Sequence, residues 1–97
     1  MREDLHIAIV GATGAVGLEM LKTLEKRNFP VSSLTPLASA RSAGKTLPFR
    51  GQELLVQELT GNSFVGVDIA LFSAGGAISK EFAPLAVDAG SVVVDNS

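Results

Sequence analysis

The chain has 97 residues, of which 46% are hydrophobic and 19% are charged, and its formal net charge is -2. This composition is typical of one compact domain. Its lysine and arginine residues are scattered along the sequence and predict no basic face for a nucleic acid or an anionic membrane, so small molecules are the expected ligands. The absence of cysteine excludes disulfides, thiolate metal sites and a cysteine nucleophile within these residues.

The first predicted elements are a strand, a glycine turn and a helix. Leu5–Val10 is short, apolar and rich in β-branched residues, as in a strand of a buried parallel sheet. The turn Gly11-Ala-Thr-Gly-Ala-Val-Gly17 follows, and apolar periodicity predicts a helix from Ala15 to about Arg27. Glycine lets the backbone approach a ligand, and a helix start presents unpaired N–H groups, so this turn predicts a phosphate site.

Within this turn the phosphate site includes Gly11 and Gly14, and the Thr13 hydroxyl either adds a hydrogen bond to the phosphate or caps the helix. The first two glycines are one residue further apart than in the usual G-x-G-x-x-G pattern. A tight turn that binds no ligand therefore remains the alternative interpretation.

A second strand is expected over Val31–Ala38, interrupted by Pro36, and it ends in a small, basic loop over residues 39–45. In a nucleotide-binding βαβ unit this position meets the adenosine ribose. The loop has no carboxylate, whereas Arg41 and Ser42, helped by Lys45, suit a 2′-phosphate. These residues predict NADP as the cofactor, and the alternative is an arginine that is simply solvated.

The middle of the chain predicts a hairpin in place of a crossover helix. Thr46–Arg50 and Gln52–Glu58 form two short strands about Gly51, and Pro48 marks the first as an edge or irregular strand. No second helical pattern follows before the next apolar run.

The last elements are a strand over Asp68–Phe72, a helix over Ile78–Ala89 and a strand over Val92–Val94. Ser79 is the expected N-cap of that helix, and Pro84 predicts a loose first turn before the regular helix. We expect strands alternating with helices to form a Rossmann-like, doubly wound α/β fold with a mostly parallel sheet, whose ligands bind at the carboxyl ends of the strands.

Other candidate residues lie at these strand ends. Ser73 and Gly75 are expected to flank the same crevice, and the alternative is a plain glycine-rich connection without a ligand. Asn96 is expected to offer its amide to the nicotinamide or simply to end the strand. The single histidine, His6, is expected at the opposite end, and Asp68 and Asp95 are interpreted as turn or cap residues. We therefore assign no catalytic or metal-ligating residue to this chain.

Four stretches taken together resemble the amino-terminal part of the bacterial aspartate-semialdehyde dehydrogenase family: Gly11–Gly17, Ala38–Lys45, Asp68–Gly76 and Val92–Ser97. The resemblance implies an NADP-dependent enzyme that reductively dephosphorylates β-aspartyl phosphate to aspartate semialdehyde, in the pathway to lysine, methionine and threonine. It also implies that the site residues are Thr13, Gly14, Ala15 and Val16 for the pyrophosphate, Arg41 and Ser42 for the 2′-phosphate, and Ser73 and Gly75 for further cofactor contacts.

The family's catalytic cysteine, which forms a thioacyl intermediate, its histidine and its substrate-binding arginines would all follow Ser97. We therefore expect residues 1–97 to be the NAD(P)-binding domain of a cytoplasmic, homo-oligomeric enzyme, and to be inactive alone. Two alternatives stay open: part of an N-acetylglutamyl-phosphate reductase, against which the loop at residues 41–45 speaks, and a non-enzymatic NADP-binding module.

Overall fold

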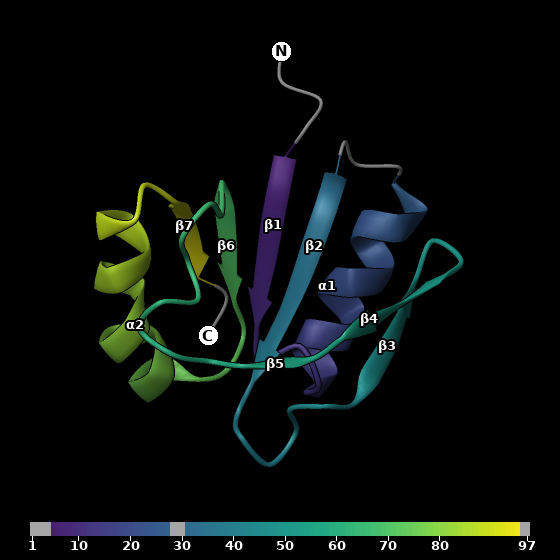
Figure 1. Ribbon diagram of the computed structural model, residues 1–97, viewed down its shortest axis with the longest axis horizontal. Coiled ribbons are helices and arrows are strands. Elements are labelled where there is room, and N and C mark those ends of the chain that lie inside the picture. The colour runs from purple at the N-terminus through teal and green to yellow at the C-terminus, as the bar shows by residue number, and fades with distance from the viewer. Residues whose placement is uncertain (1–4, 28–30, 96–97) are drawn as a thin grey trace.

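The computed structural model describes residues 5–27 and 31–95, which form a parallel sheet with a helix on each face and a separate hairpin (Figure 1). The elements are β1 (Leu5–Val10), α1 (Ala15–Lys26), β2 (Val31–Ala38), β3 (Thr46–Phe49), β4 (Gln52–Leu55), β5 (Gln57–Glu58), β6 (Ile69–Phe72), α2 (Gly76–Asp88) and β7 (Val92–Asp95). The five-stranded sheet has the order β5-β2-β1-β6-β7, and each pairing within it is parallel. The expected doubly wound α/β class is confirmed.

Alternate residues of the central strands face two separate cores, because successive side chains of a strand point to opposite faces. On one face Ala8 and Val10 of β1 pack with α2 and the stacked rings of Phe64 and Phe72, whose centroids are 5.8 Å apart. On the other face Ile9 packs with Leu21 of α1 and with the β3–β4 hairpin.

The strand order reverses at β1. From β1 the chain crosses through α1 to β2 and then to β5, whereas β6 and β7 lie on the other side of β1. In open α/β sheets such a reversal leaves a crevice at the carboxyl ends of the two central strands. Here those ends are Val10, which leads into the glycine turn, and Phe72, which leads into Ser73.

The hairpin does replace a crossover helix, as the sequence predicts. β3 and β4 pair antiparallel about Arg50 and Gly51, whose φ angles of 51° and 79° are both positive. Two such residues make the tight turn that suits a two-residue hairpin loop. The predicted strand over Gln52–Glu58 is wrong in one respect, because it divides at the buried Val56 and its last part, β5, joins the main sheet beside β2.

The predicted interruption at Pro36 is also wrong, since β2 runs through it. The Leu37 carbonyl accepts hydrogen bonds from the β1 side, and the Ala38 carbonyl accepts one from Leu59 on the other side. Because backbone groups of alternate residues point to opposite sides, the Pro36 nitrogen points away from β1. On that side β5 pairs only with Leu37 and Ala38, so a missing N–H costs no ladder bond.

The second helix differs from its prediction at the start. It begins at Gly76, with Gly75 as N-cap, so Ser79 lies inside the first turn and its hydroxyl donates a hydrogen bond to the Asp95 carboxylate. Pro84 lies within the helix on an exposed position, where solvent can reach the carbonyl that the proline leaves without a partner. Neither described helix is long and apolar enough to cross a membrane.

Candidate functional site

The three glycines of the turn differ in whether the surrounding structure has room for a side chain. Gly11 has φ +83°, and a Cβ there would lie 2.8 Å from the Cβ of Ala74. A Cβ at Gly17 would overlap the Gly11 carbonyl oxygen. At Gly14 a Cβ would meet nothing nearer than 3.5 Å, an ordinary contact. The fold therefore requires Gly11 and Gly17, whereas no neighbouring atom of the described residues requires a glycine at position 14.

The start of α1 has no side-chain cap within the described residues, and its N-cap is Gly14. Thr13, whose alternative role was that cap, instead directs its hydroxyl to the Ser42 hydroxyl at 3.5 Å, the long end of hydrogen-bonding range. The first-turn amides and the positive end of the helix dipole are thus available to an anion.

Backbone and hydroxyl groups tie the ends of the three central strands together. Gly11 N–H and Ala12 N–H both donate to the Leu37 carbonyl of β2, at 2.8 and 3.2 Å. The Ser73 hydroxyl after β6 donates to the Val10 carbonyl of β1 at 2.8 Å. The glycine turn is therefore held between two neighbouring strand ends.

A cavity of about 440 Å³ opens at this edge of the sheet, within the usual size range of small-ligand sites. Its lining residues come from the end of β1, the glycine turn, the ends of β2 and β6, the segment after β5, and α2: Val10, Gly11, Thr13, Gly14, Ala38, Ser39, Leu59, Ser73, Ala74, Ile78 and Phe82. Polar groups of the turn thus face an apolar wall of Leu59, Ile78 and Phe82.

That apolar wall is the part of the site that sequence reasoning missed. Ile78 and Phe82 share a helix face, which predicts core residues, and both do pack against the core of α2. Leu59 directly follows β5, and it reaches this edge of the main sheet because β5 pairs with β2, a long-range pairing that the sequence does not predict.

Some of the site residues predicted from the sequence line the cavity and others lie outside it. Gly11, Thr13, Gly14 and Ser73 line the cavity. Ser42 is half-buried and adjoins Thr13, whereas Arg41, Ala15 and Gly75 are exposed and lie outside the lining. Asn96 lies outside the described residues, and the Val16 side chain lines a different groove.

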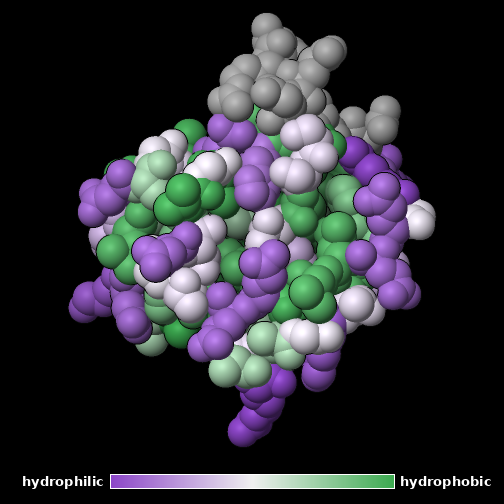
Figure 2. Space-filling view, viewed as in Figure 1, coloured by the Kyte–Doolittle hydropathy of each residue, from purple (hydrophilic) through white to green (hydrophobic). Residues whose placement is uncertain are grey.

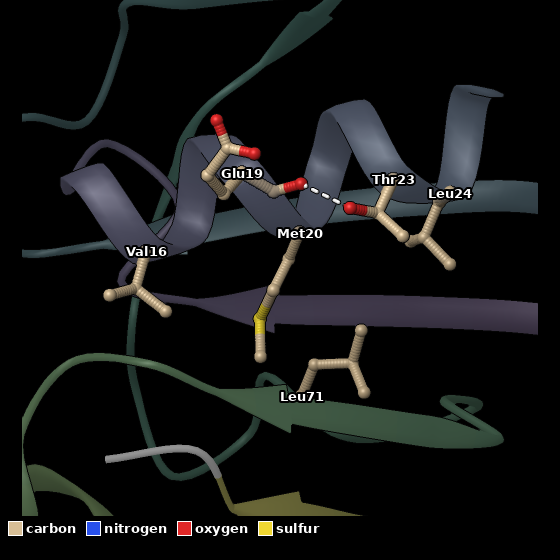
Figure 3. Close-up of a pocket in the computed structure, with 6 residues that line it drawn as sticks. All are labelled: Val16, Glu19, Met20, Thr23, Leu24 and Leu71. Atoms are coloured by element: carbon tan, nitrogen blue, oxygen red, sulfur yellow. Dashed lines mark hydrogen bonds between the residues drawn. The ribbon is translucent and has the colours of Figure 1, made fainter.

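The side chain of Val16 lines a second groove, on the face of the sheet that α1 covers (Figure 3). Figure 3 shows Val16, Met20 and Leu24 of α1 directed toward Leu71 of β6, with Glu19 directed away. This groove of about 290 Å³ is apolar and offers no cluster of catalytic groups. Any contact of Val16 with a cofactor at the glycine turn must therefore come from its backbone.

Other apolar side chains also reach the surface. Figure 2 shows hydrophobic residues on the side of α2 and, separately, on the side of α1 and the hairpin. Large exposed examples on these and other elements are Leu55, Val65, Leu85, Val87, Val92 and Val94. Patches of this kind mark contact surfaces, but nothing in their chemistry selects a ligand.

His6 lies at the amino end of β1, away from the cavity, as expected. Its Nε2 lies 2.7 Å from the Thr35 hydroxyl, and its Nδ1 lies 3.2 Å from the Gly66 carbonyl. The Asp68 carboxylate accepts the His6 backbone N–H at 2.8 Å. Among the described residues no group of three or more histidine and acidic side chains could hold a metal ion.

Comparison with known proteins connects this geometry to a family. Residues 6–97 match the family model described as semialdehyde dehydrogenase, NAD binding domain. The whole chain is 64% identical to part of an aspartate-semialdehyde dehydrogenase of Legionella pneumophila, of which it covers 28%. The chain thus spans little more than a quarter of that relative's length.

Two solved structures show the same fold. Aspartate semialdehyde dehydrogenase II of Vibrio cholerae, complexed with ASA, superposes with a TM-score of 0.93 at 51% identity, over 97% of this chain and 31% of that one. The Candida albicans enzyme with NADP gives a TM-score of 0.81 at 27% identity, over 97% of this chain and 30% of that one. In each comparison nearly the whole of this chain matches about a third of the solved chain.

Proposed function

The chain belongs to the family of semialdehyde dehydrogenase NAD-binding domains, and from this premise we propose that residues 1–97 are the NADP-binding portion of an aspartate-semialdehyde dehydrogenase. The family establishes a nicotinamide cofactor, and the choice of NADP is the further step. Relatives that carry the same name at 64% and 60% identity support the assignment to that enzyme.

One observation carries the choice of NADP: the hydroxyl contact between Thr13 and Ser42. It joins the glycine turn, which offers amides to a pyrophosphate, to the loop that offers Arg41. A dinucleotide phosphate has its anionic groups at these two places, on the pyrophosphate and on the adenosine 2′ position. No carboxylate occurs within residues 39–45 to repel the second phosphate.

The proposed roles follow from these positions. Gly11, Thr13 and Gly14, with the backbone amides of Ala15 and Val16, hold the pyrophosphate. Arg41 and Ser42 bind the 2′-phosphate through charge-assisted hydrogen bonds. Ser73, Gly75 and Asn96 contact the nicotinamide half, where the Ser73 oxygen can still accept a hydrogen bond while its proton is donated to Val10.

NADP, when bound, supplies hydride exchange with the substrate. The residues of this chain bind and orient the dinucleotide, while Leu59, Ile78 and Phe82 exclude water from one side of it. In the whole protein, the proposed reaction is reductive dephosphorylation of β-aspartyl phosphate to aspartate semialdehyde. The proposal includes a homo-oligomer in the cytoplasm.

Calorimetric titration of the chain with 2′-phospho-AMP and with AMP tests the cofactor assignment. We expect the 2′-phosphorylated fragment to bind more tightly by about 1–3 kcal/mol, the scale of a charge-assisted hydrogen bond. Equal affinity for the two fragments would contradict the choice of NADP. The same titration is repeated with NADP and with NAD, and failure of both dinucleotides to bind would contradict the cofactor site itself.

A further inference from the structure

The loop that carries Arg41 and Ser42 is closed at its amino end. Ser42 N–H and Ala43 N–H both donate to the Ser39 carbonyl, at 3.0 and 3.1 Å. These bonds make one compact turn in which Arg41 is exposed and Ser42 faces Thr13. The direction of the Arg41 side chain therefore depends on how this turn is oriented.

The other end of the loop is fixed by the chain segment between β4 and β5. Gly44 N–H donates to the Val56 carbonyl at 2.8 Å, and Val56 N–H donates to the Lys45 carbonyl at 2.8 Å. Val56 is itself only 1% exposed, so its position is set by the core. This pair of bonds forms a rigid attachment between the loop and the body of the domain.

Gly44 makes the bend that allows this attachment. Its φ is +94°, in a region that residues with a side chain rarely adopt. No atom lies within 4 Å of a Cβ placed there, so packing does not explain the glycine. The glycine is therefore explained by its positive φ, which the loop needs in order to bend toward Val56.

We propose that Gly44, held by Val56, is a positioning residue that orients the Arg41–Ser42 turn toward the 2′-phosphate and thereby sets the preference for NADP over NAD. The inference rests on the proposed function. It also gives the hairpin a role, because the replacement of a crossover helix by β3 and β4 is what brings Val56 beside Gly44.

The test compares Gly44→Ala with Gly51→Ala. Gly51 has φ +79° and likewise has nothing within 4 Å of a Cβ, so both variants strain the backbone without a clash, but Gly51 lies at the hairpin tip. We expect Gly44→Ala to raise the Kd for NADP about fivefold or more, and to change the Kd for NAD less than about twofold. Gly51→Ala leaves both constants within about twofold of the wild type.

Hydrogen exchange gives a readout that needs no nucleotide. The Ser42 and Ala43 amides should exchange faster in Gly44→Ala than in Gly51→Ala, because the turn loses its fixed end. If the wild type prefers NADP and the two variants nevertheless match in both exchange and affinity, the inference is overturned and the proposed function stands. A wild type without preference for NADP would instead overturn the proposed function, and this inference with it.

Discussion

At the scale of single residues, the glycine turn contains glycines that the fold needs and one, Gly14, that only the proposed cofactor would need. Gly17 leaves room for the Gly11 carbonyl at the junction of β1 and α1, whereas Gly14 has space for a methyl group. The same spacing of glycines in the sequence therefore hides two different constraints. Only the structure tells them apart.

Alanine at each position should show this difference. We expect Gly17→Ala to lower the free energy of unfolding by about 3 kcal/mol, since its Cβ meets backbone that cannot move away. Gly14→Ala should cost about 1 kcal/mol or less, as an exposed N-cap change, yet weaken NADP because its methyl group stands where the phosphate approaches. Urea unfolding followed by nucleotide titration measures both effects, and equal loss of stability in the two variants would contradict this division.

At the scale of elements, the β3–β4 hairpin covers part of one sheet face and leads to Val56. Phe49 of β3 is buried in the core that α1 forms with the sheet, and the Arg50 guanidinium lies 4.9 Å from its ring and donates to the Leu24 carbonyl of α1 at 3.0 Å. The hairpin is thus packed against the domain and can hold the loop before it.

Truncation within the hairpin tests that packing. Phe49→Ala should destabilise the fold by about 3–5 kcal/mol, the usual cost of removing a buried ring. Leu55→Ala, on the neighbouring strand and 56% exposed, is the matched control and should change stability by about 0.5 kcal/mol or less. Thermal unfolding measures the stability of the two variants. Similar losses of stability in both would mean that the hairpin is not packed as described.

Periodicity predicted the main elements because they are long or strongly patterned. β1 agrees residue for residue, α1 to within one residue, and Gly90 follows the end of α2 with φ +97°. The errors at Pro36, Val56 and Ser79 have a common cause. In each case the structure is decided by a neighbour that is distant in the sequence. This neighbour is β5 for Pro36, β2 for the strand after Val56, and Asp95 for the Ser79 hydroxyl.

The sequence likewise predicted the part of the candidate site that has local sequence signals. Gly11, Thr13, Gly14 and Ser73 carry local signals, a glycine turn and strand ends, and they meet in one cavity. The apolar wall was not predictable, because Ile78 and Phe82 look like ordinary core positions until α2 is placed over the carboxyl edge of the sheet.

At the scale of the whole molecule, the chain separates its candidate cofactor site from its single histidine. It has no cysteine and one histidine, and that histidine lies at the opposite edge of the sheet from the cavity. The chain spans 28% of the length of relatives named aspartate-semialdehyde dehydrogenase. The proposed function assigns cofactor binding to this region and catalysis to the rest of such a protein.

We accordingly expect the purified 97-residue chain to show no oxidation of aspartate semialdehyde in the presence of NADP and phosphate, whatever its affinity for the cofactor. The reason is that no thiol is present to form an acyl intermediate. Absorbance of NADPH provides the assay, with a complete enzyme of the family as the positive control. Turnover by this chain alone would show that the division is wrong.

The central claim is that this edge of the sheet binds NADP through Arg41, and paired titration of Arg41→Ala with NADP and NAD tests it most directly. We expect the variant to lose about 1–3 kcal/mol of binding free energy for NADP and almost none for NAD, with Arg41→Lys keeping part of the NADP affinity. Equal losses for the two nucleotides, or no loss for either, would contradict the assignment of the 2′-phosphate to Arg41.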